Sequence, residues 1–86
     1  MTMTLRAGVS TAETDYGMTL LDEASGEYFT LNPTGSHVLR MLLDGGTPAQ
    51  AVQALAAEYA VDAATADQDV AELLDGLRSA RLVAER

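Results

Sequence analysis

Ser36 and His37 are the pair of side chains that comes nearest to a nucleophile and its base, and His37 is the single histidine of the chain. Both fall in a stretch with helical spacing, and adjacent helical residues do not face each other. The histidine is therefore badly placed to take a proton from the serine. The absence of cysteine excludes disulfides, thiolate metal sites and a cysteine nucleophile. We expect no enzyme.

Carboxylates at Asp67, Asp69 and Glu72 are the second group with chemical potential, because carboxylate oxygens bind hard cations. Calcium needs about six or more oxygens, and no loop of this chain supplies them. Asp69, Glu72 and Asp75 instead follow three-residue steps, which place them along one flank of a helix. This acidic stripe has two open interpretations, a solvated surface or a face that meets a basic partner. We expect neither a metal nor a cofactor.

Charge restricts the partners. The chain has 86 residues and a formal net charge of −8, with a pI near 4.2. Such a surface repels nucleic acid and anionic membranes overall and attracts basic peptides or proteins, although acidity can also serve only solubility. Gly45-Gly46 precedes Thr47-Pro48 without a lysine, so it is not a phosphate-binding loop. No signal peptide or membrane-spanning run of about 20 apolar residues is recognisable, which predicts a cytoplasmic protein.

A strand that leads directly into a helix organises the chain. Tyr28 to Leu31 alternate, so Phe29 and Leu31 share one face while Tyr28 and Thr30 share the other. Asn32 can cap the following helix, whose first position is a proline without an N–H to satisfy. The pattern predicts a strand with one buried face and an abrupt helix start.

Two further strands are predicted before the strand at Tyr28 to Leu31. Strict alternation over residues 3–10 predicts a first strand, residues 11–16 have the composition of a connection, and residues 18–21 form a second apolar run. A short turn over residues 22–26 then leads into the strand at Tyr28. Three strands joined by short turns make an antiparallel meander with two unpaired edges. We expect one edge to be the working surface.

Three helices are predicted after the strand at Tyr28 to Leu31. The first ends at Asp44-Gly45-Gly46, and the second starts with a Thr47-Pro48-Ala49-Gln50 capping box, buries one side and ends near Ala60. The third, capped by Asp62, runs from about Ala63 to Ala80, and Leu82 and Val83 close the core. Gly76 lies inside it at a cost of about 1 kcal/mol relative to alanine. Either another element approaches closely there, or the helix tolerates a weak position. The buried side of the second helix and the apolar face of the third are predicted to comprise Val52, Leu55, Ala56 and Tyr59, and Ala66, Val70, Leu73, Leu74, Leu77 and Ala80, respectively.

These elements predict one domain over residues 1–86 with an α+β fold, winged helix-turn-helix-like, in which a three-stranded antiparallel sheet precedes three helices. A winged-helix DNA-binding regulator is one alternative function, but the last two helices are acidic or nearly free of charge. An acyl carrier protein is excluded because Ser36 lacks the Asp-Ser-Leu pattern and strands lead the chain. A general acidic interaction domain remains a third possibility.

The order and spacing of three segments resemble the PqqD-like RiPP recognition elements, which bind leader peptides in ribosomal peptide natural-product pathways. The resemblance covers about residues 3–83 and is strongest to the stand-alone recognition proteins of actinobacterial lasso-peptide clusters. It rests on Gly26-x-Tyr28-Phe29-x-Leu31-Asn32-x-Thr34-Gly35, on Leu42-Leu43-Asp44-Gly45 followed by Thr47-Pro48, and on Asp69-Val70-x-x-Leu73-Leu74-x-x-Leu77.

The resemblance implies that a leader peptide adds as a strand to the third strand, in the groove between that strand and the third helix. It also implies three partners: the precursor leader, a separate leader peptidase of the cysteine protease type, and the ATP-dependent lasso cyclase. Tyr28 and Asp69 are the preferred contacts, whereas Phe29 and Leu74 are assigned to the core ahead of a contact role, because a core this small needs them. The implied site residues are Glu27, Tyr28, Phe29, Thr30 and Leu31 on the strand, Val70 and Leu74 for apolar contacts, and Asp67 and Asp69 for basic leader residues.

Overall fold

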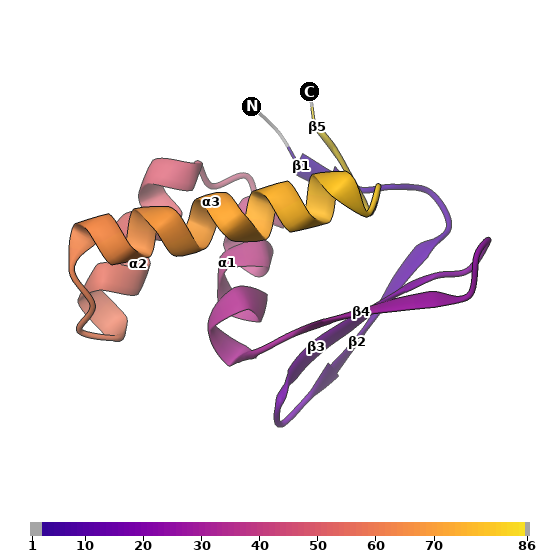
Figure 1. Cartoon of the computed structure of the whole chain (residues 1–86), viewed down its shortest axis with the longest axis horizontal. Coiled ribbons are helices and arrows are strands. Elements are labelled where there is room, and N and C mark those ends of the chain that lie inside the picture. Colours follow the sequence, from indigo (N-terminus) through magenta and orange to yellow (C-terminus); the bar gives the residue numbers. More distant parts are fainter. Residues whose placement is uncertain (1–2, 86) are drawn as a thin grey trace.

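The computed structural model describes residues 3–85, and within that range it has three helices and five strands (Figure 1). Residues 1, 2 and 86, which the predicted single domain includes, lie outside the described range. A three-stranded antiparallel sheet followed by three helices confirms the predicted fold class. In chain order the elements are β1 (Met3–Leu5), β2 (Val9–Thr14), β3 (Gly17–Asp22), β4 (Glu27–Leu31), α1 (Pro33–Leu43), α2 (Pro48–Glu58), α3 (Ala63–Ser79) and β5 (Val83–Glu85).

The first predicted strand was wrong in its extent. The strand ends at Leu5, because a turn redirects the backbone there. In this turn the Val9 N–H donates to the Arg6 carbonyl, and Gly8 has φ 86°. The predicted connection over residues 11–16 is instead mostly strand, since β2 continues to Thr14 and turns through two residues only. The meander therefore consists of β2, β3 and β4, with β3 in the centre.

A second, two-stranded sheet joins the two ends of the described chain. β1 pairs antiparallel with β5, so that Met3 lies opposite Glu85 and Leu5 opposite Val83. Figure 1 shows both ends together, above the C-terminal end of α3. The sequence pattern did not predict β5, because it assigned Val83 only to the closing of the core.

The helix boundaries follow local capping. Asn32 and Asp62 each accept a hydrogen bond from a backbone N–H three residues later, at 2.7 Å, and Thr47 and Gln50 form the predicted capping box. The prediction that α2 ends near Ala60 was two residues too long, since Glu58 is the last helical residue and Ala60 has φ 54°. Its buried side was also partly wrong, because Tyr59 is exposed.

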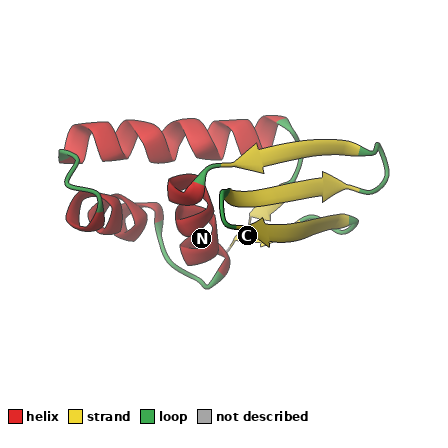
Figure 2. Ribbon diagram, turned by 90° about the horizontal axis from the view of Figure 1, so that it is seen from below, coloured by secondary structure: helices red, strands yellow, loops and turns green. Residues whose placement is uncertain are grey.

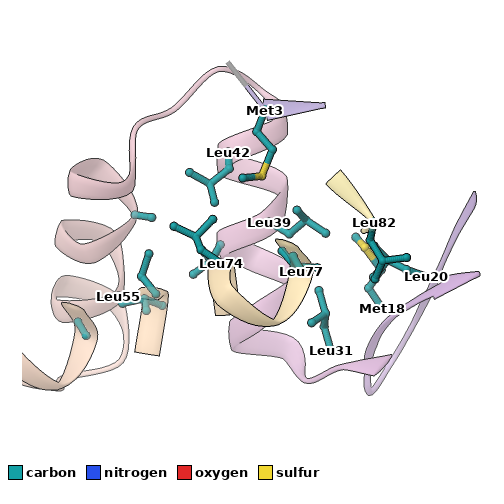
Figure 3. Packing of buried hydrophobic residues seen from close by; sticks show 14 residues of the cluster. Met3, Met18, Leu20, Leu31, Leu39, Leu42, Leu55, Leu74, Leu77 and Leu82 are labelled. Atoms are coloured by element: carbon teal, nitrogen blue, oxygen red, sulfur yellow. The ribbon is translucent and has the colours of Figure 1, made fainter. Parts of the chain in front are cut away.

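One aliphatic core connects the sheet to the helices (Figure 3). Met18 and Leu20 of β3 pack from one side, and Leu39 at the centre of α1 is completely buried. α3 crosses α1 and contributes Leu77, while Leu82 closes the core beside β5, as predicted. The core thus fixes α3 relative to the meander, which determines the shape of the site described below.

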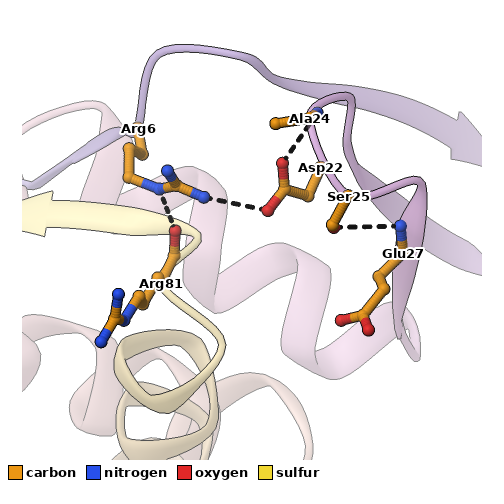
Figure 4. Close-up of polar contacts among 6 residues, drawn as sticks. All are labelled: Arg6, Asp22, Ala24, Ser25, Glu27 and Arg81. Atoms are coloured by element: carbon orange, nitrogen blue, oxygen red, sulfur yellow. Dashed lines mark hydrogen bonds and ion pairs between the residues drawn. The ribbon is translucent and has the colours of Figure 1, made fainter.

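Two groups of polar contacts tie the two-stranded sheet of β1 and β5, here called the terminal ribbon, to the rest of the fold. The Arg6 guanidinium donates to the Arg81 carbonyl and to the Asp22 carboxylate, the latter at 2.9 Å (Figure 4). Arg78 forms a two-pronged ion pair with Glu85, whose hydrogen bonds lower the pKa of that carboxyl and raise the pKa of the guanidinium. β5 is therefore held to the end of α3.

Acid is expected to weaken the fold at the start of α3. The Thr65 backbone N–H and hydroxyl hold the pKa of Asp62 below its ordinary value. A carboxyl with a lowered folded pKa contributes stability above its unfolded pKa and loses that contribution as the pH falls through the folded pKa. Urea unfolding between about pH 5 and pH 3 should show decreasing stability. Asp62→Asn, which keeps a capping oxygen but does not titrate, should show a smaller decrease; an equal decrease would contradict this assignment.

Candidate functional site

The free edge of β4 is the first component of the site. β3 lies between β2 and β4. Along β3, the backbone N–H and C=O groups of successive residues therefore point alternately toward β2 and toward β4. The Glu23 N–H donates to Gly8, just before β2, at 2.9 Å, and Gly17 closes a two-residue turn with Thr14. The backbone N–H and C=O groups of odd-numbered residues of β3 therefore point toward β2, and those of even-numbered residues point toward β4.

This alternation fixes which groups of β4 are free. Leu20 of β3 is opposite Phe29, and the other even-numbered residues of β3 are opposite Leu31 and Glu27. Those three residues of β4 use their N–H and C=O groups toward β3. The N–H and C=O groups of Tyr28 and Thr30 consequently point away from the sheet, at an edge with no strand beside it among residues 3–85.

Helix α3 lies beside this edge and forms the second component. Figure 2 shows β4 as the strand of the meander nearest to α3. A hollow of about 380 Å³ lies where β4 passes into α1. Its wall on the α3 side is formed by Asp69, Glu72 and Leu73, and the remaining lining residues are Thr30, Leu31, Asn32, Thr34, Gly35, Val38 and Leu55. We call it the larger hollow.

A smaller hollow of about 60 Å³ lies toward the other end of β4. It is lined by Asp22, Glu27, Tyr28, Phe29, Ala80 and Leu82. The two hollows and the β4 edge between them are here called the β4–α3 groove. Because Asp69 lines one hollow and Ala80 the other, the groove follows α3 over about three turns.

Phe29 lies between the two hollows and reaches α3 at Gly76. A methyl group on Gly76 would be 3.4 Å from Phe29 Cζ, which is van der Waals contact. The sequence left two explanations open for this glycine, and the structure confirms a close approach by another element. Phe29 is half-buried and packs against the core, whereas Tyr28 on the opposite face of β4 is 71% exposed.

The groove is acidic at both ends. Within residues 3–85, neither Asp69 nor Glu72 forms an ion pair, and Glu72 accepts only a hydrogen bond from Gln68, at 3.2 Å. Glu27 at the smaller hollow likewise has no arginine partner in that range. The guanidiniums of Arg6, Arg40 and Arg78 are instead paired with Asp22, Glu13 and Glu85. The larger hollow therefore offers two uncompensated carboxylates to a ligand.

The predicted residues of α3 separate into three groups. Asp69 lines the larger hollow, whereas Asp67 is exposed and does not line it. Val70 and Leu74 are buried in the core of the free chain, so neither offers an open surface to a ligand. The apolar wall belongs to Leu73, which the site prediction missed although it lies four residues, one helical turn, after Asp69.

The structure also separates the residues considered for catalysis. The buried Ser36 hydroxyl donates to the Pro33 carbonyl at 2.9 Å, while His37 points to Glu58 at 3.7 Å and to the Tyr59 ring. Residues 3–85 contain no group of three or more histidine, cysteine or acidic side chains arranged to hold a metal ion.

Comparison with known protein families identifies the chain. The family described as coenzyme PQQ synthesis protein D (PqqD) matches residues 17–83, which include the entire β4–α3 groove. The chain belongs to the PqqD family. A search of curated protein sequences found no match. Among residues 3–85 of this PqqD-family chain, no helix has the length and hydropathy required to span a membrane.

Three solved structures are similar to this PqqD-family chain. A lasso peptide synthetase B1 complexed with the leader peptide is 41% identical, with a TM-score of 0.91 over 99% of this chain and all of its own. TbiB1, in complex with the TbiA(beta) leader peptide, is 31% identical, with a TM-score of 0.85 over 100% and 98% of the two chains. The PqqD part of Methylobacterium extorquens PqqCD, a stand-alone RiPP recognition element, is 25% identical, with a TM-score of 0.73 over 96% and 88%.

Proposed function

We propose that this chain binds the leader segment of a lasso-peptide precursor by strand addition to β4. The observation that carries the proposal is the free edge of β4 beside a groove walled by α3, in a chain that is 41% identical to a synthetase B1 solved with its leader peptide. Strand addition gives affinity through main-chain hydrogen bonds and specificity through side-chain pockets. The β4–α3 groove supplies both.

Binding uses the backbone groups of Tyr28 and Thr30, which point out of the sheet. The leader residues that exchange hydrogen bonds with them extend the order of strands to four. Ordering a disordered leader costs about 2 to 5 kcal/mol, and a net affinity between micromolar and nanomolar corresponds to about −8 to −12 kcal/mol. A few edge hydrogen bonds and a filled larger hollow of about 380 Å³ are of the right order to supply this.

The role of the chain is delivery rather than catalysis. Ser36 and His37 are not paired, and within residues 3–85 no hydrogen bond joins the threonine hydroxyls of the larger hollow to its carboxylates. The leader peptidase, of the cysteine protease type, and the lasso cyclase are the partners that act on the bound precursor. A leader held against a rigid strand presents its cleavage site at a fixed distance from the domain.

Charge at the larger hollow is expected to accelerate and strengthen leader binding. Asp69→Asn removes one uncompensated carboxylate and should weaken binding by about threefold at low salt, mainly through slower association. The effect should fade as salt rises, because the Debye length falls to about 10 Å at 0.1 M. Stopped-flow fluorescence of a labelled leader at several salt concentrations measures it.

Asp67→Asn is the matched control, because Asp67 is on the same helix, two residues away, and outside the hollow. It removes the same charge from the protein. Equal effects of the two substitutions would show that only the net charge matters, and no effect of either would leave the acidic stripe as a solvated surface.

The function itself is tested by fluorescence anisotropy of a labelled leader from the precursor encoded in the same gene cluster. A scrambled leader of identical composition is the control. Micromolar or tighter binding of the native leader, with the scramble at least about tenfold weaker, is expected. Equal binding of both peptides would mean that the acidic surface only collects positive charge, and the proposal would fail.

A further inference from the structure

We propose that Phe29 and Gly76 divide the β4–α3 groove, so that the ligand residue opposite Phe29 must have a small side chain. The ligand residue two positions away, opposite Leu31, is then the one with a long side chain that enters the larger hollow. This inference rests on the proposed function and specifies the peptide that the groove accepts.

The alternation of side chains along strands determines which ligand residues enter the groove. Residues directly opposite each other on paired strands have their side chains on the same face of the sheet. Phe29 and Leu31 face the core and α3, whereas Tyr28 and Thr30 are exposed on the other face. Ligand residues opposite Phe29 and Leu31 therefore point into the groove, and the residue between them points away from it.

The space available at these two positions differs greatly. Opposite Leu31, the larger hollow provides about 380 Å³. Its lining includes the buried Val38 and Leu55 and the half-buried Leu73, together with the exposed carboxylates of Asp69 and Glu72. This combination suits a side chain with an apolar body and a hydrogen-bond-donating end, which describes arginine, lysine and tyrosine.

Opposite Phe29 the space is small, because the Phe29 ring reaches α3 and the hollow that it lines measures about 60 Å³. The phenyl ring extends from β4 to α3, and its Cζ would be in van der Waals contact, at 3.4 Å, with a methyl group on Gly76. A ligand side chain at this position meets the flank of the ring, and the smaller hollow beyond the ring offers about 60 Å³. Glycine, alanine and serine fit such a position, whereas leucine and larger side chains require the ring to move.

The experiment is a substitution scan of the same cluster-encoded leader, in which each residue is replaced in turn by alanine and by leucine. Binding to the wild-type protein is measured by competition anisotropy. We expect one position where leucine weakens binding at least about tenfold and alanine does not. Two residues away we expect a position where alanine weakens binding at least about tenfold.

Phe29→Leu removes the ring while keeping an apolar side chain against the core. The affinity of this variant for the leader with leucine at the small position should be within about threefold of its affinity for the native leader. Gly76→Ala leaves the ring in place, adds a methyl group against it and favours the helix. This variant should increase the penalty for alanine at the small position and leave the large position unchanged, and it tests the proposal even if Phe29→Leu does not fold.

The outcomes separate the two claims. If wild-type protein does not bind the native leader, the proposed function fails and this inference with it. If it binds, but the scan has no position that rejects leucine, or both variants keep the wild-type preferences, the division of the groove is overturned and the proposed function stands.

Discussion

Replacing Thr30 by proline is expected to weaken leader binding by at least about thirtyfold while the protein remains folded. The Thr30 N–H points away from β3, so proline removes no hydrogen bond of the sheet, and proline is tolerated at such edge positions. The complex loses the hydrogen bond that the Thr30 N–H donates, and the ligand carbonyl that would accept it is left without a partner in the groove. Together these losses amount to about 2 kcal/mol or more, which corresponds to about thirtyfold. Fluorescence anisotropy with the native leader measures the change.

Thr11→Pro is the matched control on the opposite edge of the same sheet. Thr11 of β2 is exposed and lies opposite Leu20, whose backbone groups point to β4, so the Thr11 N–H also points outward. The same substitution is thus made at an equivalent position, away from α3. We expect it to bind leader like the wild type. If Thr11→Pro abolished binding and Thr30→Pro did not, the leader would add to β2 instead.

Gly17→Ala is expected to cause a large loss of stability, and the clash that it creates is the most severe that an added Cβ meets at any glycine of this chain. A Cβ on Gly17 would lie 1.9 Å from the carbonyl oxygen of Leu31, and φ at Gly17 is 135°, which side chains rarely allow. The strands β3 and β4 must separate at Met18 and Leu31, both of which are in the core. We expect a loss of roughly 4 kcal/mol, comparable to the total stability of a marginal small domain.

Gly26→Ala separates the two contributions to that loss. Gly26 also has a positive φ, 76°, but a methyl group there meets nothing within 4 Å. Only backbone strain is added, of about 1 to 2 kcal/mol. Chemical denaturation with urea compares the two variants. Similar losses would show that the contact with the Leu31 carbonyl is relieved at little cost.

The helices were predictable because their signals are local. Asn32, Thr47 and Asp62 each accept a bond from a backbone N–H within their own turn, and a proline follows the first two. Such contacts require no knowledge of the rest of the fold. The switch from β4 to α1 was predictable for the same reason, and it positions both the strand edge and the larger hollow.

The first strands could not be predicted, because their limits depend on distant partners. Alternation from Met3 to Ser10 continues through Gly8, and only the positive φ of that glycine shows that two strands are present. β5 is paired with β1 at the opposite end of the chain, so Val83 carries no local sign of a strand. Non-local pairing is the information that a single sequence lacks.

The site was predicted at the level of elements but not of individual side chains. The pattern placed Phe29 and Leu31 on one face of β4, which the structure confirms. On α3, helical spacing alone could not distinguish Leu74 in the core from Leu73 in the hollow, because both positions are within one turn of the acidic stripe. The distinction depends on how α3 is rotated against α1, which only packing determines.

The pairing of β1 with β5 has a consequence for the order in which the molecule assembles. The meander and each helix connect residues that are close in the chain, whereas the terminal ribbon must close a loop from Met3 to Glu85. Contacts of such large sequence separation pay the greatest loop-closure entropy and are expected to form last during folding. Since Arg78 and Glu85 join this ribbon to the end of α3, the wall of the groove beside Ala80 becomes fixed only in that final step. Pairing of β5 with β1 is thus the event that completes the smaller hollow.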